Sequence, residues 1–186
     1  PHNDVIVFGR QAAESGIQKY LDLFMRDPEI RLNVWVAIAD TSADEVLKAD
    51  PGLQQIPSIT IDKILRTQYA SSNITQVTLS QFASRLLSNT TAPIMPIVQI
   101  VSHQGTNQSL YVSKTAVFRD DRLVGELNPE ETRGMLWVLN KISGGIIEIE
   151  GSSKDKLISM EIMRSKSKVK VHLVDGQVKV NVRIRE

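Results

Sequence analysis

The stretch LNVWVAIA, residues 32–39, decides the fold class expected for the first half of this 186-residue chain. Its residues are almost all apolar or β-prone, without the apolar-polar alternation of a strand that has one face in water. A strand of this kind is typical of a sheet that is covered on both faces. We therefore expect residues 32–39 to form a buried strand of an α/β layer.

Strand and helix signals alternate around this stretch. Residues 5–8, VIVF, are a short apolar run, and apolar residues then recur at helical spacing over residues 13–24 until Asp27-Pro28 closes the helix. After the buried strand, Ser42 and Glu45 have the spacing of a capping box, which begins another helix. The order strand, helix, strand, helix predicts an incomplete α/β layer with a mixed sheet, whose other strands we expect upstream of the given sequence.

Two more helices are predicted in the same segment. They cover residues 56–66 and 79–87, and the second begins at the capping box Thr78-Leu79-Ser80-Gln81. We expect residues 1–90 to be the C-terminal part of an α/β first domain with a helical extension.

A second unit is expected after two prolines that disfavour helix, and we place a domain boundary near residues 88–96. Two β-prone runs, residues 110–118 and 123–127, flank the turn sequence RDDR and predict a hairpin. Asn128, Pro129 and Glu131 then begin a helix as N-cap, first helical residue and carboxylate at the third position. Residues 91–145 are thus predicted to form a small α+β middle domain.

From residue 146 onward the apolar residues have a period of two, without helix signals. This pattern predicts an antiparallel β meander that opens a β-rich third domain at residues 146–186. The fold class expected for the whole chain is therefore mixed α+β. The four strand candidates are residues 146–150, 156–164, 167–174 and 177–185.

Composition excludes several classes of protein. The chain has no cysteine, which rules out a disulfide scaffold, a Cys-ligated zinc site and a thiol nucleophile. The net charge of +1 is distributed unevenly along the chain. Residues 1–150 carry 13 Lys+Arg and 17 Asp+Glu, a balance of −4. Residues 151–186 carry 9 Lys+Arg and 4 Asp+Glu, a balance of +5. The basic tail indicates either an anionic partner or two pieces of structure that neutralise each other.

The last hairpin is the most informative local feature. With Asp175-Gly176 as a two-residue turn, one face is almost wholly apolar, which specifies the register. The expected pairs on this apolar face are Leu173 with Val178, Val171 with Val180, Val169 with Val182, and Ser167 with Ile184. The expected pairs on the other face are His172 with Lys179, Lys170 with Asn181, Lys168 with Arg183, and Lys166 with Arg185. Like charges directly opposite one another on this other face are unfavourable unless an opposite charge or solvent compensates them. This second face, here called the basic face, is the candidate interaction surface: Lys166, Lys168, Lys170, His172, Lys179, Arg183 and Arg185.

Several surroundings could compensate the basic face. Acidic residues on neighbouring strands are one, with Glu148, Glu150 and Glu161 nearest in sequence, and lipid head groups or nucleic acid are others. The face could also simply be solvated, because Lys and Arg side chains extend into water and discourage edge pairing. Nucleic acid is disfavoured, since the hairpin has no interleaved aromatic residues for base stacking. The sequence does not decide between acidic residues, lipid head groups and water.

Signatures of cofactor and metal binding are absent from the sequence. The turn after Gly9 follows a predicted strand and opens a helix, but it has neither the G-x-G-x-x-G spacing nor a Gly-Lys-Ser/Thr end. The histidines His2, His103 and His172 have no second histidine at ligand spacing. We therefore expect no cofactor-binding residue and no metal-binding residue.

Pairs of adjacent carboxylates occur at residues 44–45, 120–121 and 130–131. Each pair lies at a predicted helix start or turn, where acidic residues are favourable without any catalytic role. We expect no catalytic residue and no enzyme. The alternative from a different class is a small secreted or surface enzyme, carbohydrate-active, that uses two such carboxylates.

Several stretches of the sequence together indicate a family. In the first half they are VIVFG at residues 5–9, AESGI at 13–17, YLD at 20–22 and RDPE at 26–29. In the second half they are AVFRDDRLVG at residues 116–125, ETRG at 131–134 and the β-rich residues 156–185. With these stretches the sequence resembles the Ger(x)C lipoproteins, the C subunits of spore germinant receptors in spore-forming Firmicutes. The matching residues are strand, turn and capping residues, so no active-site residue is carried over.

The resemblance implies a lipid-anchored protein of three domains on the outer face of the inner spore membrane. It implies a non-enzymatic subunit that acts with the integral membrane A and B subunits as a nutrient germinant receptor, without a cofactor and without nucleic acid. The acyl-bearing cysteine and the signal peptide would lie upstream of Pro1, so we expect the chain to be a fragment of a longer protein. On this view the basic face is a candidate docking surface for lipid head groups or for an acidic subunit loop.

Overall fold

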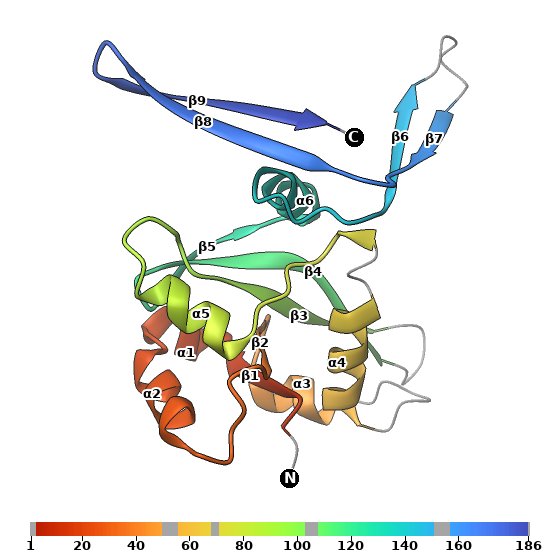
Figure 1. Cartoon of the computed structure of the whole chain (residues 1–186). Helices are drawn as coiled ribbons and strands as arrows, with labels where there is room; N and C mark the ends of the chain where they lie inside the picture. The colour runs from red at the N-terminus through yellow and green to blue at the C-terminus, as the bar shows by residue number, and fades with distance from the viewer. Residues whose placement is uncertain (1–2, 50–55, 68–70, 103–107, 151–156, 186) are drawn as a thin grey trace.

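A five-stranded mixed sheet forms the centre of the computed structural model, which describes residues 3–49, 56–67, 71–102, 108–150 and 157–185 (Figure 1). The first three strands are parallel, and the last two continue the sheet in antiparallel fashion. The strands follow one another in space in the order of the sequence. They are β1 (Val5–Gly9), β2 (Trp35–Ala39), β3 (Ile94–Ser102), β4 (Gln108–Arg119) and β5 (Arg122–Leu127).

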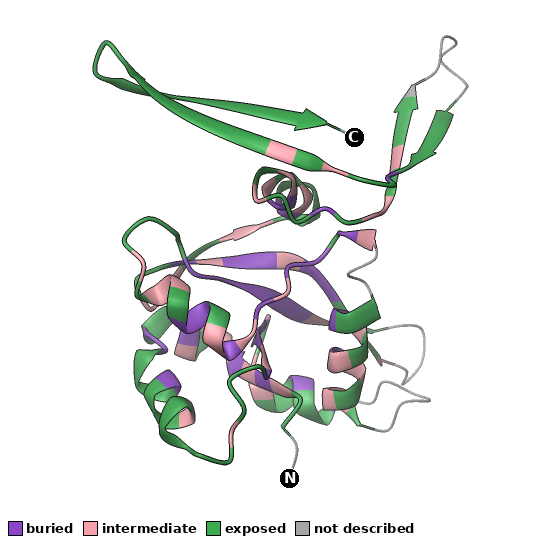
Figure 2. Cartoon of the chain, viewed as in Figure 1, coloured by how far each residue is buried: buried purple, intermediate pink, exposed green. Residues whose placement is uncertain are grey.

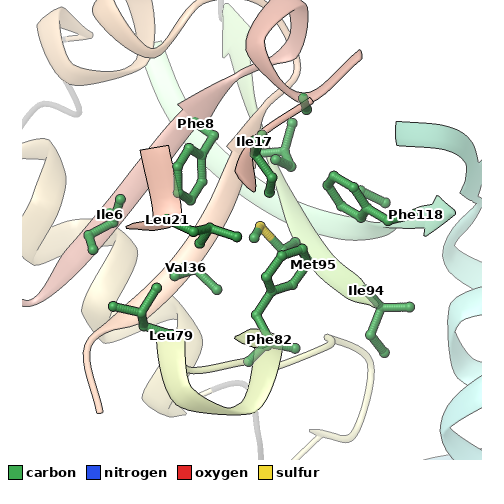
Figure 3. Packing of buried hydrophobic residues seen from close by; sticks show 14 of the residues in the cluster. Ile6, Phe8, Ile17, Leu21, Val36, Leu79, Phe82, Ile94, Met95 and Phe118 are labelled. Carbon is green, nitrogen blue, oxygen red and sulfur yellow. The ribbon is translucent and has the colours of Figure 1, made fainter. Parts of the chain in front are cut away.

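Helices cover both faces of this sheet, as the uninterrupted apolar run of β2 predicts. One face is covered by α1 (Arg10–Ser15), α2 (Gln18–Arg26) and α5 (Leu79–Leu86), and the other by α3 (Ala43–Lys48) and α4 (Pro57–Thr67). The alternation of side chains along β1 separates the two cores. Ile6 and Phe8 belong to the core with Ile17 and Phe82, here called core A (Figure 3). Val5 and Val7 pack against core B, which contains Val46, Ile61 and Leu65.

The outer edge of β2 is shared by two partners. Its end pairs with β3, whereas its beginning is hydrogen-bonded to the segment that leads into α5. The amide of Val36 donates to the carbonyl of Val77 at 3.0 Å, and the amide of Leu79 donates to the carbonyl of Val34 at 2.9 Å. Both halves of this edge are therefore paired.

The single helix expected over residues 13–24 is wrong, because the structure has two helices, α1 and α2, that meet at Gly16. Gly16 has φ +111°, a conformation that residues with a side chain rarely adopt. A Cβ atom at this position would lie 2.6 Å from Oδ2 of Asp121. The turn between β4 and β5, which contains Asp121, therefore approaches the break, where the amide of Ile17 donates to the Asp121 carbonyl at 3.0 Å.

Three helices begin at the N-cap residues that the sequence predicts. Thr78 and Gln81 form the predicted capping box of α5, with each side chain bonded to the other residue's amide. Asn128 and Glu131 do the same for α6 (Pro129–Val138), which has proline in its first turn as expected. Ser42 accepts a hydrogen bond from the amide of Glu45 at 3.1 Å at the start of α3. The sequence Asp50-Pro51-Gly52, which predicts the end of this helix, lies outside the described residues.

The sheet crosses the domain boundary predicted near residues 88–96. β2, from the first predicted domain, pairs with β3, from the second. The rings of Phe82 in α5 and Phe118 in β4 pack edge to face, with their centroids 5.2 Å apart (Figure 3). The two segments thus share core A, and the division into residues 1–90, 91–145 and 146–186 stays a prediction.

The C-terminal segment forms two hairpins that stand apart from the sheet (Figure 1). The first consists of β6 (Ile146–Glu150) and β7 (Leu157–Glu161), and the second of β8 (Lys166–Val174) and β9 (Gln177–Arg185). The antiparallel pairing expected within each hairpin is confirmed, but β7 and β8 do not pair, so the predicted continuous meander is divided in two. The mixed α+β fold class is confirmed.

A small third core connects α6 to the hairpins. It contains Leu136, Ile142 and Ile162, each 5–6% exposed. The amide of Ser167 in β8 donates to Oδ1 of Asn140 at 2.8 Å, which joins the second hairpin to the residues after α6. The base of the second hairpin is therefore attached, while most of its length is exposed (Figure 2).

Candidate interaction surface

The seven residues of the basic face lie together on one side of the β8–β9 ladder. The pairs run from Lys166–Arg185 through Lys168–Arg183 and Lys170–Asn181 to His172–Lys179, which is the register that the sequence predicts. Side chains at alternate positions of a strand point to the same face, so three of the four pairs place cations opposite cations or histidine. All seven residues are exposed.

The basic face forms no ion pair within the described residues. None of the ion pairs formed by residues of the described ranges involves a side chain of β8 or β9. Glu148 and Glu161, two of the acidic residues considered as compensators, lie in the separate β6–β7 hairpin. Within the described residues, the like charges of the basic face are therefore not compensated by an ion pair.

The opposite face of the same hairpin is apolar and largely uncovered. Exposure rises along the hairpin from 42% at Val169 to 75% at Leu173 near the turn. Single exposed apolar residues are common on protein surfaces, but a contiguous set is typical of a surface that packs against another part of a protein, a partner protein or a membrane. The set comprises Val169, Val171, Leu173, Val178, Val180, Val182 and Ile184, all at least 42% exposed.

The three carboxylate pairs occupy the structural positions that the sequence predicts for them. Residues 44–45 and 130–131 lie in the first turns of α3 and α6. Residues 120–121 form the turn between β4 and β5, where Asp121 Oδ2 accepts a hydrogen bond from the amide of Gln18 at 3.2 Å. Each pair therefore has a capping or turn role in the fold.

A charged cluster that sequence reasoning missed lies at the carboxyl ends of β1 and β2. Arg10 follows β1 and donates from its guanidinium to the side chains of Asp40 and Glu126. It also donates to the backbone carbonyl of Asp40 at 2.8 Å. Gln99 donates to Asp40 Oδ2 at 2.9 Å, and Lys114 lies 3.6 Å from Glu126. The cluster joins the start of α1 to β2, β3, β4 and β5.

Hydrogen bonding in this cluster lowers the pKa of the Asp40 carboxyl. Burial alone would raise this pKa, but the hydrogen bonds from Arg10 and Gln99 and the charges of Arg10 and Lys114 outweigh burial, so that it falls below its ordinary value of 3.8. A depressed pKa means that the ionised Asp40 stabilises the folded chain above about pH 4. This contribution is lost as the pH falls through the pKa of the folded state.

Asp40→Asn is expected to reduce the free energy of unfolding by about 1–3 kcal/mol at pH 7, because Arg10 and Gln99 lose a charged acceptor. The difference from the unsubstituted chain should shrink below about pH 4, where Asp40 itself becomes protonated. Urea unfolding followed by circular dichroism from pH 7 to pH 3 measures both effects. Asp44→Asn, at an exposed surface ion pair with Lys48, is the control and should cost no more than about 1 kcal/mol. Equal effects of the two substitutions would contradict a stabilising role for the cluster.

Two residues of this cluster could be located from the sequence. Arg10 and Asp40 directly follow two predicted strands, and the carboxyl ends of adjacent parallel strands meet at one edge of a sheet. Glu126 is 116 residues from Arg10 and belongs to an antiparallel strand, so no sequence spacing indicates its position. Within the described ranges, no group of three or more His, Asp or Glu residues could hold a metal ion. No described helix combines the length and hydropathy that a membrane span requires.

Comparisons with known proteins agree with this architecture. Residues 1–100 match the family model described as spore germination protein N-terminal domain. Residues 113–186 match the model described as spore germination B3/GerAC like, C-terminal. The chain therefore belongs to the GerAC family of spore germination proteins, the Ger(x)C family that its sequence resembles.

Individual relatives support the same assignment. The chain is 24% identical over 197 residues to spore germination protein KC of Bacillus subtilis (strain 168), and it covers 48% of that protein. It is 24% identical over 188 residues to spore germination protein B3 of the same organism, of which it covers 49%. The crystal structure of the GerBC protein matches 98% of this chain and 51% of that chain, with a TM-score of 0.70 and 21% identity. The chain thus spans about half the length of these proteins, and the GerBC structure shows the same fold.

Proposed function

We propose that this chain is part of a germinant receptor C subunit, which serves spore germination as a non-enzymatic interaction protein. The observation that carries this proposal is the match of residues 1–100 and 113–186 to two models of one germination family. The capping and turn roles of the three carboxylate pairs support a non-enzymatic role, because an acid–base enzyme needs its carboxylates free to act on a substrate. The carboxylate-dependent enzyme has no comparable support.

The proposed partners are the integral membrane A and B subunits of a nutrient germinant receptor. We place the parent protein on the outer face of the inner spore membrane, held by an N-terminal lipid anchor. The test is crosslinking of the full-length parent protein in spores, followed by its purification and mass spectrometry of the proteins recovered with it. Recovery of two integral membrane subunits is expected. A parent protein that is present and crosslinked, but without such subunits, would contradict the proposal.

We propose further that the basic face docks on the anionic head groups of the membrane. The ladder of nine residues per strand is about 30 Å long, at a rise of about 3.3 Å per residue, so its cations can contact a flat surface together. Each Lys or Arg near an anionic membrane contributes about 1 kcal/mol of attraction. The absence of ion pairs to described residues leaves these side chains available for such a surface.

Replacing Lys166, Lys168, Lys170 and Lys179 together with Gln is expected to weaken binding to anionic vesicles about 100-fold or more, because four surface cations are lost. Binding is measured by co-sedimentation with vesicles of phosphatidylcholine containing 30% phosphatidylserine, in comparison with phosphatidylcholine alone. Raising the salt concentration should weaken the binding of the unsubstituted chain, because the attraction is screened.

The matched control replaces the same four lysines with Arg, which keeps the charge and should keep the binding. Binding that is unaffected by the Gln substitutions, or equal on neutral vesicles, would contradict lipid docking. If the Gln variant binds vesicles normally but loses a membrane subunit in the spore crosslinking experiment, the partner of the basic face is an acidic protein loop instead.

We also propose that residues 146–186 open a β-rich third domain, distinct from units at residues 1–90 and 91–145. The exposed apolar face of the β8–β9 hairpin supports this division, because such a face needs a partner layer. Relatives about twice as long as this chain have room for one. Adding the following segment of the parent protein should protect the β8 and β9 amides from hydrogen exchange; unchanged exchange would contradict the proposal.

A further inference from the structure

A cavity of about 410 Å³ lies where the three cores of the chain meet. Its wall contains Ile74 from core B, Val77 and Ile94 from core A, and Leu136 from the third core, all of them buried. A cavity at the meeting point of three packed units is the usual place for a small-molecule site, and its volume lies in the range of such sites. The sequence did not indicate it, because its walls come from distant segments.

The charged residues of this cavity are all cations. Arg85, in the last turn of α5, and Lys141, after α6, both line it, and no Asp or Glu occurs among its described lining residues. Neither cation forms an ion pair with a described residue. Arg85 donates to the backbone carbonyl of Ala92 at 3.1 Å. Burial lowers the pKa of the Arg85 guanidinium, so this cation is partly desolvated without an anion beside it.

A buried row of hydroxyls ends at the same cavity. Thr75, which lines it, is hydrogen-bonded to Thr115 at 2.7 Å, and Thr132 donates to Thr115 at 3.1 Å. The Thr132 hydroxyl can also donate to the Leu127 carbonyl at 3.3 Å; Thr115 then donates to Thr132 and Thr75 donates to Thr115, so that every hydrogen of the row has an acceptor. The hydroxyls beside the cavity can therefore all be paired within the protein.

We propose that this cavity binds a small organic anion, with one carboxylate held by Arg85 and Lys141 and an apolar body against Ile74, Leu136 and Leu139. The guanidinium fork of Arg85 matches the two oxygens of a carboxylate. Apolar walls with a few convergent polar groups are typical of sites that take such a molecule. This site is separate from the basic face and does not depend on the membrane or subunit contacts proposed above.

The test uses three probes of one shape and different charge: benzoate, neutral benzamide and cationic benzylamine. Each is titrated into the chain with isotope-labelled methyl groups, and the methyl resonances of Ile74, Val77, Ile94, Leu136 and Leu139 are followed by NMR. Benzoate is expected to shift these resonances with a Kd of the order of 1 mM, as befits so small a molecule. Benzamide should bind about tenfold more weakly, and benzylamine should not bind.

Substitution identifies the cations that hold the probe. Arg85→Gln is expected to weaken benzoate binding about tenfold, through loss of a charge-assisted pair of hydrogen bonds. Arg122→Gln, at the first residue of β5, removes the same charge away from the cavity and should change nothing. If Arg85→Gln does not fold, Lys141→Gln, at an exposed residue after α6, gives the second measurement of the same effect.

Each of three results would overturn the proposal. The first is no shift of the cavity methyl resonances with benzoate at about 20 times the expected Kd. The second is equal affinity of the chain for benzoate and benzamide, and the third is equal affinity for benzoate of the unsubstituted chain and of both cavity variants. These outcomes are independent of vesicle binding and of spore crosslinking, so the site and the proposed function can fail separately.

Discussion

Phe118→Ala is expected to lower the free energy of unfolding of the whole five-stranded sheet by about 3–5 kcal/mol, the usual cost of removing a buried phenylalanine. Phe118 is 1% exposed, near the end of β4, and packs edge to face on Phe82 of α5. The pair connects the segment before residues 88–96 with the segment after them. Its loss should therefore destabilise both segments together.

Urea unfolding followed separately by circular dichroism and by tryptophan fluorescence measures this effect. The two tryptophans are Trp35 in β2 and Trp137 in α6, so a Trp137→Phe background makes fluorescence report on the first segment alone. Tyr111→Ala is the control on the same strand: Tyr111 is 48% exposed, and its removal should cost about 1 kcal/mol or less. Two separate transitions, of which Phe118→Ala shifts only the later segment, would contradict a shared core. A Phe82→Ala and Phe118→Ala double-mutant cycle should give a coupling of about 0.5–1.5 kcal/mol.

Gly145→Ala should have the second largest effect, about 2–4 kcal/mol, because backbone strain and a backbone clash act together. Gly145 has φ +115°, and a Cβ atom there would lie 2.6 Å from the carbonyl oxygen of Ser71. A backbone oxygen cannot swing aside as the end of a side chain can. Ser72 also accepts hydrogen bonds from the amides of Ser143 and Gly144, at 2.9 and 3.1 Å, so residues 71–72 hold the segment after α6 closely.

Gly134→Ala is the matched control within α6. A Cβ atom at Gly134 would have nothing within 4 Å, and alanine is the better helix former by about 1 kcal/mol, so this variant should be as stable or more stable. Thermal unfolding and hydrogen exchange of the β6–β7 amides distinguish the two substitutions. Equal stability of both variants would mean that residues 71–72 move away from Gly145 at little cost.

Local features of the fold could be predicted from the sequence because their causes are local. The register of the last hairpin follows from its turn and its alternation, and the capping boxes at Thr78 and Asn128 follow from two side chains three residues apart. Helical periodicity does not show the break at Gly16, and Asp121, whose side chain approaches it, is distant in the sequence. The split of the predicted meander was missed for a similar reason, since strand periodicity does not say which strands pair.

The same distinction applies to the sites. The seven residues of the basic face could be placed on one side because a single hairpin holds them all. The cluster of Arg10, Asp40 and Glu126 and the cavity beside Arg85 depend on contacts between distant strands and helices. Their residues carry no common motif, so only the folded chain brings them together.

The order of the strands in the central sheet has a consequence for synthesis of the chain. Because the spatial order β1-β2-β3-β4-β5 repeats the sequence order, each strand leaving the ribosome adds to the outer edge of the preceding one, and none has to insert between strands already paired. The longest interval between the synthesis of two consecutive strands follows β2, which ends at residue 39, because β3 begins only at residue 94. At about 5–20 residues per second this gap lasts several seconds. Residues 77–79 are synthesised before β3 and hydrogen-bond to the first half of the free edge of β2. They shorten the time during which a nascent β2 could pair with another chain.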